Sequence, residues 1–164
     1  GLARIAADEL DLASGPAGEA ARLALEALEH EEFRALVEEA QALRQEVEFC
    51  VPLAELGVSE TEQPGFVEGS IDLVVLGENR TLILDYKTDA EVAPARYWSQ
   101  LGLYGMVARH CGLAPGEVEL ALFYVRAGQL LRRSLDDELL ASLEEMLRGA
   151  SVASDGIGQS LESG

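Results

Sequence analysis

Cysteine is scarce in this chain, and long apolar runs are missing. Two cysteines, Cys50 and Cys111, exclude a disulfide framework and any four-cysteine metal cluster built by this chain alone, so no iron–sulfur cluster is expected. We expect both thiols to be buried or unreactive. No apolar run approaches the ~20 residues that span a bilayer, and no charged-then-apolar leader opens the sequence. These absences predict a cytoplasmic protein that does not associate with a membrane.

Positive charge is also in short supply. Twelve Lys and Arg residues face 30 Asp and Glu residues, which gives a formal net charge of −18. Such an acidic domain repels phosphate backbones at long range, which argues against a stand-alone nucleic-acid binder. The charge is compatible with a metal site, or with a module whose basic surface lies elsewhere in a larger protein. With 164 residues, 48% of them hydrophobic, the chain can form one domain with a real core.

Apolar spacing predicts a mixed α/β domain. We expect helices within residues 1–43, a strand at 46–51, a hairpin of strands 66–76 and 81–87, a helix at 94–110, a second hairpin of strands 118–126 and 129–134, and a helix at 135–148. We expect residues 1–45 to be a helical segment that packs on a core of residues 46–148. Small and polar residues over 149–164 predict a flexible tail.

The first hairpin carries the candidate chemistry. A turn centred on Glu78 and Asn79 would place Asp72 directly across from Asp85, and cross-strand neighbours point to the same face of a sheet. Lys87 follows Asp85 by two residues and therefore shares that face. Asp89, two residues further on, reads as a loop or capping residue. Three ionisable groups thus converge at the end of an otherwise apolar hairpin.

Two carboxylates at this spacing repel each other unless a cation or a proton lies between them. Mg²⁺ is suited to such a position, because it takes one or two carboxylates together with waters and phosphate oxygens. Lys87 could hold an attacking water and offset charge on a phosphate. The alternative is a structural salt bridge in which Lys87 joins Asp72 and Asp85 at the end of a buried strand pair.

Three short motifs resemble one family. They are Gly69-x-Ile71-Asp72, then Asp85-Tyr86-Lys87-Thr88, then Gln100-x-x-x-Tyr104. In this order they are similar to the RecB-type branch of the PD-(D/E)XK nuclease superfamily, above all to the C-terminal nuclease domain of RecB or AddA helicase–nuclease subunits. The resemblance covers residues 46 to 126. It implies a restriction-endonuclease-like core, in which helices flank a mixed central β-sheet.

The resemblance also implies roles for individual residues. Asp72 and Asp85 match the metal-binding acids, and Lys87 matches the catalytic lysine. We expect Mg²⁺ or Mn²⁺ between the two acids, with the main-chain carbonyl of Tyr86 as a further ligand. A lower-ranked candidate for approaching the metal is Glu48, on the polar face of the preceding strand.

A helix beside this hairpin carries the third motif. Gln100 and Tyr104 match the family's helix motif beside the active site. Helical spacing places Tyr97 on the same face, independently of the family. We expect these three residues to support the active site or contact DNA, although Tyr97 and Tyr104 as plain core aromatics remain an alternative.

One family feature is replaced. The family usually carries a histidine, as a further metal ligand, in a Gly-x-x-x-His pattern on an early helix. Here Gly18 is followed at that spacing by Arg22, and in an alternative register Gly15 is followed by Glu19. His30 and His110 do not fit the pattern, and we expect them at the surface or at helix ends.

The expected function is therefore a Mg²⁺-dependent deoxyribonuclease of the exodeoxyribonuclease V type. The resemblance implies a single DNA strand fed by a helicase motor of the same chain, with a partner subunit, in recombinational repair and DNA end processing. The missing histidine motivates an alternative function, a catalytically inactive nuclease-fold domain that serves as a scaffold or docking module.

Overall fold

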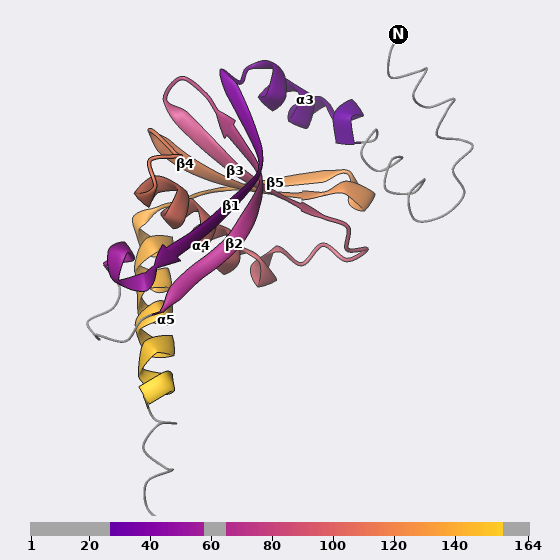
Figure 1. Ribbon diagram of the computed structural model, residues 1–164. Helices are drawn as coiled ribbons and strands as arrows, with labels where there is room; N and C mark the ends of the chain where they lie inside the picture. Colours follow the sequence, from indigo (N-terminus) through magenta and orange to yellow (C-terminus); the bar gives the residue numbers. More distant parts are fainter. Residues whose placement is uncertain (1–26, 58–64, 156–164) are drawn as a thin grey trace, which may run out of the picture.

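The computed structural model describes residues 27–57 and 65–155, and Figure 1 shows their arrangement. The elements in chain order are α3 (Glu31–Glu38), β1 (Ala42–Pro52), η1 (Leu53–Leu56), β2 (Phe66–Leu76), β3 (Arg80–Lys87), η2 (Pro94–Arg96), α4 (Trp98–His110), β4 (Glu117–Tyr124), η3 (Val125–Ala127), β5 (Gln129–Ser134) and α5 (Asp137–Asp155), where η marks a 3₁₀ turn. The helices expected before residue 27 lie outside the described residues. None of the described helices is long and apolar enough to cross a membrane.

The five strands form one mixed sheet in the order β1-β2-β3-β4-β5. Neighbouring strands are antiparallel except for β3 and β4, which run parallel. A parallel pair needs a crossover connection, and here the crossover contains α4. Both predicted hairpins and the expected mixed sheet flanked by helices are confirmed, consistent with a restriction-endonuclease-like fold.

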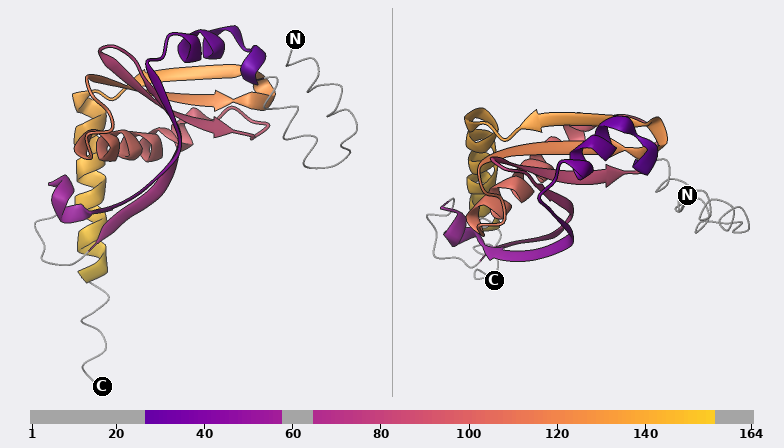
Figure 2. Two further views of the ribbon diagram at one scale, coloured as in Figure 1. Left: turned by 45° about the horizontal axis from the view of Figure 1, so that its top comes forward. Right: turned by 90° about the horizontal axis from the view of Figure 1, so that it is seen from above.

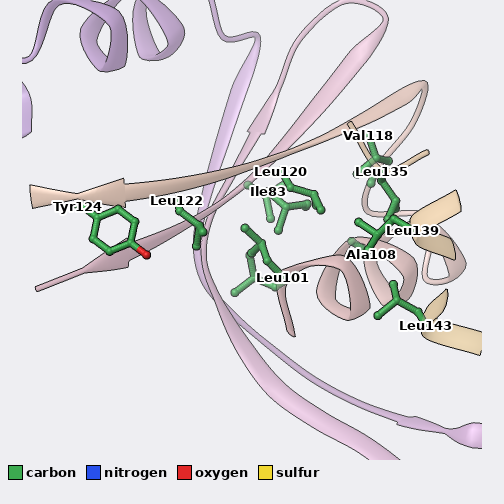
Figure 3. Close-up of a cluster of buried hydrophobic side chains, with 13 residues drawn as sticks. Ile83, Leu101, Ala108, Val118, Leu120, Leu122, Tyr124, Leu135, Leu139 and Leu143 are labelled. Atoms are coloured by element: carbon green, nitrogen blue, oxygen red, sulfur yellow. The ribbon is translucent and has the colours of Figure 1, made fainter. Parts of the chain in front are cut away.

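Helices cover both faces of the sheet (Figure 2). On one face, side chains such as Ile83 and Leu122 pack with Leu101 of α4 and Leu143 of α5 (Figure 3). On the other face, Phe33 of α3 belongs to a separate buried cluster that includes alternate residues of the same strands. Successive side chains of a strand point to opposite faces, so β3 and β4 contribute to both clusters. Asp85 and Lys87 have the same parity as Ile83 and therefore belong to the α4 side.

Two predicted boundaries were wrong. Leu43, assigned to a helix, lies in β1, because Ala42 and Leu43 pair with the last residues of β2 and the helical pattern ends with α3. The final helix continues to Asp155 instead of ending at Arg148. The glycine at 149 does not end it, since glycine inside a helix costs only about 1 kcal/mol relative to alanine.

Strand β2 loses one of its two neighbouring strands partway along its length. β1 follows β2 from Leu76 to Phe66, whereas the pairing of β2 with β3 ends at Leu73↔Leu84. Beyond that point β1 and β2 continue as a two-stranded ribbon away from the rest of the sheet (Figure 1). At the turning point Glu46 has a φ of 49°, a left-handed conformation uncommon for residues other than glycine. The site described next lies at this fork between β2 and β3.

Candidate active site

The fork exposes main-chain groups that a continuous ladder would satisfy. Leu73 pairs with Leu84, which confirms the register predicted for the hairpin, but the regular ladder stops one position short of Asp72 and Asp85. The Tyr86 N–H instead donates to Asp72 Oδ2 at 2.8 Å. The carboxylate of Asp72 thus takes the place of a strand partner, as expected where main-chain donors lose their ladder. The two aspartates flank the fork instead of facing each other within the ladder.

Asp85 and Lys87 form a tight, largely buried ion pair. Lys87 Nζ lies 2.6 Å from Asp85 Oδ2, and each side chain is 14% exposed. Asp85 Oδ2 is fully buried and, among the described residues, has no hydrogen bond of regular geometry besides this ion pair. Burial raises the pKa of Asp85, Lys87 opposes that rise, and the negative charges of Asp72 and Asp89 add to it. These mutual effects place all four ionisable groups in one cluster.

Tyr97 closes this cluster from the start of α4. Lys87 Nζ lies 3.9 Å from the centroid of the Tyr97 ring, a cation–π contact. The Tyr97 hydroxyl donates to Asp89 Oδ2 at 3.1 Å. Asp89, predicted only as a loop or capping residue, therefore orients Tyr97. A simple count could have singled out this region, because Lys87 is the only lysine among the 164 residues.

The helix motif of Gln100 and Tyr104 lies against the strand motif that begins at Gly69. Gln100 Nε2 donates to the Tyr104 hydroxyl at 2.9 Å, and the Tyr104 ring packs edge-on to Phe49, with 5.2 Å between centroids. A Cβ atom at Gly69 would lie 3.1 Å from the Tyr104 hydroxyl and 2.9 Å from Phe49 Cζ. Glycine at this position of β2 thus lets the helix motif approach the strand that carries Asp72.

Glu48 is not brought into this cluster. It is exposed and pairs through its main chain with Ser70 on β2 beyond the fork, and its side chain makes no hydrogen bond or ion pair within the described part of the chain. Gln100 is exposed as well, whereas Tyr97 and Tyr104 are half-buried. Tyr86 directs its side chain to the α3 side, where it contacts Phe33 with 6.1 Å between ring centroids. Only the main chain of Tyr86 contributes to the cluster.

The histidines lie at helix ends, as expected. His30 caps α3, where its Nδ1 accepts a hydrogen bond from the Phe33 N–H at 3.3 Å. His110 is the last residue of α4, and its Nε2 lies 3.3 Å from Glu55 Oε2. The positions that replace the family histidine, Arg22 or Glu19, lie outside the described residues.

Both cysteines are exposed, so they are not buried as the first alternative expected, and that the thiols are unreactive stays a prediction. Cys50 falls on the outward-facing side of β1, in alternation with the buried Val51, and Cys111 follows the last residue of α4. Neither position offers an apolar environment that would enclose a side chain.

The oxygen donors at the fork fit a hard divalent cation. Among the described residues, no group of three or more His, Cys, Asp or Glu side chains gathers as a metal site. The available donors are the carboxylates of Asp72 and Asp85 and the Tyr86 carbonyl, which points to the same strand edge as the Tyr86 N–H. Mg²⁺ is commonly held by one or two carboxylates with several waters retained. The Asp85 carboxylate lies at this fork, with its Oδ2 buried beside Lys87 Nζ.

Comparisons with known proteins give one result that bears on this arrangement. A search of curated proteins found no significant match. A family model described as the PD-(D/E)XK nuclease superfamily matches residues 2–158, nearly the whole chain. Enzymes of this superfamily are generally nucleases and typically use divalent metals such as Mg²⁺. The match and the fold agree: the chain belongs to the PD-(D/E)XK nuclease superfamily.

Proposed function

We propose that this chain is a metal-dependent deoxyribonuclease domain that hydrolyses phosphodiester bonds. One observation carries the proposal. Two aspartates and the only lysine of the chain gather where β2 leaves β3, with Lys87 Nζ 2.6 Å from Asp85 and Asp72 bonded to the main chain of Tyr86. Superfamily membership supports a nuclease-type domain, and the cluster supplies residues that could perform the reaction.

The residues of the cluster would divide the work. Asp72, Asp85 and the Tyr86 carbonyl would hold Mg²⁺ or Mn²⁺, which supplies Lewis-acid polarisation of the scissile phosphate. Lys87 would hold the attacking water and offset the negative charge that develops on the phosphate in the transition state. Asp85 orients the ammonium of Lys87 through their ion pair. Gln100 and Tyr104, linked at 2.9 Å, would support the site or contact DNA from α4.

The substrate and the setting come from the RecB and AddA likeness of the motifs. We propose that a helicase motor in the same polypeptide, with a partner subunit, feeds a single DNA strand to this domain in recombinational repair. Activity would then be of the exodeoxyribonuclease V type. The net charge of −18 supports this division of labour, because the basic surface that binds DNA would belong to the motor.

The decisive experiment removes Asp85. Asp85→Ala should abolish metal-dependent cleavage of a single-stranded oligonucleotide in Mg²⁺ or Mn²⁺. The change removes a proposed metal ligand, which is also the ion-pair partner of Lys87. Circular dichroism should show an intact fold. Asp137→Ala serves as the matched control, since Asp137 is exposed in the first turn of α5. Cleavage retained by Asp85→Ala would refute the assignment of the site.

Calorimetry separates this function from the inactive scaffold. If the domain is a nuclease, it should bind Mn²⁺, and Asp72→Asn and Asp85→Asn should each weaken that binding. If the wild-type chain binds no Mn²⁺ and cleaves no DNA while remaining folded, the scaffold function is favoured. Because calorimetry does not depend on turnover, it distinguishes a missing metal site from a missing substrate.

A further inference from the structure

We propose that Tyr97 is a positioning residue for Lys87: its ring holds the ammonium at the fork, and Asp89 holds the ring. The catalytic consequence of this contact rests on the proposed nuclease function, whereas the contact itself does not. Helical spacing alone placed Tyr97 beside Gln100 and Tyr104. Its contacts place it against Lys87 and Asp89 instead.

The geometry is that of a clamp formed by two contacts to the ammonium. The ammonium of Lys87 lies 3.9 Å from the centre of the Tyr97 ring and 2.6 Å from Asp85 Oδ2. On the adjacent strand, Lys87 is in register with Tyr124, whose side chain is fully buried on the α4 side of the sheet. Figure 3 shows Tyr124 at one end of the buried row, apart from the residues packed between α4 and α5.

A lysine needs such a clamp to act from a fixed position. Its ammonium sits on a flexible four-carbon stem, and an ordered lysine loses up to about 2 kcal/mol of rotamer entropy. One ion pair fixes the distance to Asp85 but leaves the stem free to rotate around it. A ring face adds a second attraction, which is stronger when the cation is desolvated, as it is for a side chain only 14% exposed. The two contacts together define the direction in which the remaining N–H groups point.

The hydroxyl of Tyr97 explains how the ring keeps its place. Tyr97 is the N-cap residue of α4, and its carbonyl accepts a hydrogen bond from the Leu101 N–H at 2.9 Å, so the main chain is fixed by the helix. The side chain is fixed by Asp89, which accepts from the hydroxyl at 3.1 Å. Asp89 follows Lys87 by two residues, so the clamp ties the end of β3 to the start of α4.

The contact can be tested without any enzymatic assay, because the chain has a single lysine. Selective ¹³C labelling of lysine gives one set of side-chain signals, provided that the expression tag contains no lysine. In the wild-type chain the ring current of Tyr97 should shift the ε-methylene protons of Lys87 upfield. Tyr97→Phe keeps the ring but loses the hydroxyl bond to Asp89, so it should retain only part of the shift, and Tyr97→Leu should lose the shift. Trp98→Leu, the same type of change at the next residue, is the control and should leave the shift in place.

Kinetics then tests the consequence. Tyr97→Leu should lower kcat for metal-dependent cleavage by about tenfold with little change in KM, since only the placement of Lys87 is disturbed. Tyr97→Phe should lower kcat less than Tyr97→Leu does, because the ring face against Lys87 remains and only the hydroxyl bond to Asp89 is lost. A signal that stays shifted in Tyr97→Leu overturns the clamp. If the shifts behave as expected but no form of the chain cleaves DNA, the clamp stands and the nuclease function fails.

Discussion

At the scale of single residues, the cluster is governed by the burial of Asp85. Most carboxylates gain stability in the folded state from their partners, which lowers their pKa. For Asp85 the largest effect is burial, which disfavours the charged form and raises the pKa above the usual 3.8, although Lys87 acts in the opposite direction. Burial of the charged form of Asp85 therefore costs free energy of folding. A costly buried charge is typical of functional sites.

A pH prediction follows for the metal-free protein. Between pH 3.8 and the raised pKa, the folded state binds more protons at Asp85 than the unfolded state does. The contribution of this group to the free energy of unfolding is therefore greatest at low pH and falls as the pH rises through that window. The difference in unfolding free energy between wild type and Asp85→Asn should accordingly fall with rising pH.

Urea unfolding in EDTA, at a series of pH values from about 3.5 to 7.5, measures this difference. The same series on Asp137→Asn, at an exposed position, controls for the general charge of the protein. A wild-type advantage that grows with pH would show that the ion pair with Lys87 outweighs burial, contrary to the expected sign.

At the scale of elements, the position of α4 depends on two glycines, which let the helix approach its neighbours closely. A Cβ atom at Gly105 would lie 3.0 Å from Leu120 of β4 and 3.0 Å from Leu135. A Cβ atom at Gly102 would lie 2.9 Å from Leu143 of α5. The first approach seats α4 against the sheet, and the second seats it against α5. The seating of α4 in turn fixes the positions of Tyr97 and Gln100.

Gly105→Leu should therefore destabilise the protein. Added methylenes in a packed interior cost about 1–3 kcal/mol, and here they would push α4 away from the sheet. Ser99→Leu is the control, since Ser99 is exposed on the same helix and should change stability by less than about 0.5 kcal/mol. Chemical denaturation measures both variants, and equal effects at the two positions would contradict this account of the packing.

At the scale of the whole molecule, charge limits what the isolated chain can do. A net charge of −18 repels a phosphate backbone unless cations intervene. Several of the described cations also form ion pairs with acids of the chain itself. Arg132, for example, contacts Glu119 at 2.5 Å and Glu32 at 3.4 Å. We therefore expect this chain to bind DNA only when a divalent ion occupies the fork or when another domain supplies a basic surface.

The isolated chain should bind DNA poorly without divalent metal. In EDTA at physiological salt, fluorescence anisotropy with a labelled single-stranded oligonucleotide should show no saturable binding at micromolar protein. Ca²⁺ should restore binding in the wild type but not in the Asp72→Asn, Asp85→Asn double variant, because the ion would bridge carboxylates and phosphate. Tight binding in EDTA would contradict the assignment of the DNA-binding surface to a separate motor.

Much of the fold could be predicted because its signals are local. Alternating apolar residues marked both hairpins, and turn residues set the register that Leu73 and Leu84 confirm. Prediction failed where distant contacts decide the structure. Leu43 joins a strand because β2 offers it a partner.

The local sequence alone placed Asp85 and Lys87 on one face of one strand. The period of two along a strand does not depend on the rest of the chain. The two other contacts of the cluster depend on the tertiary structure. Asp72 reaches Tyr86 because β2 departs from β3, and Tyr97 reaches Lys87 because α4 crosses from β3 to β4. Both contacts join residues only 14 and 10 positions apart, but they depend on how β2, β3 and α4 are arranged in space, which the period of a strand or of a helix does not record.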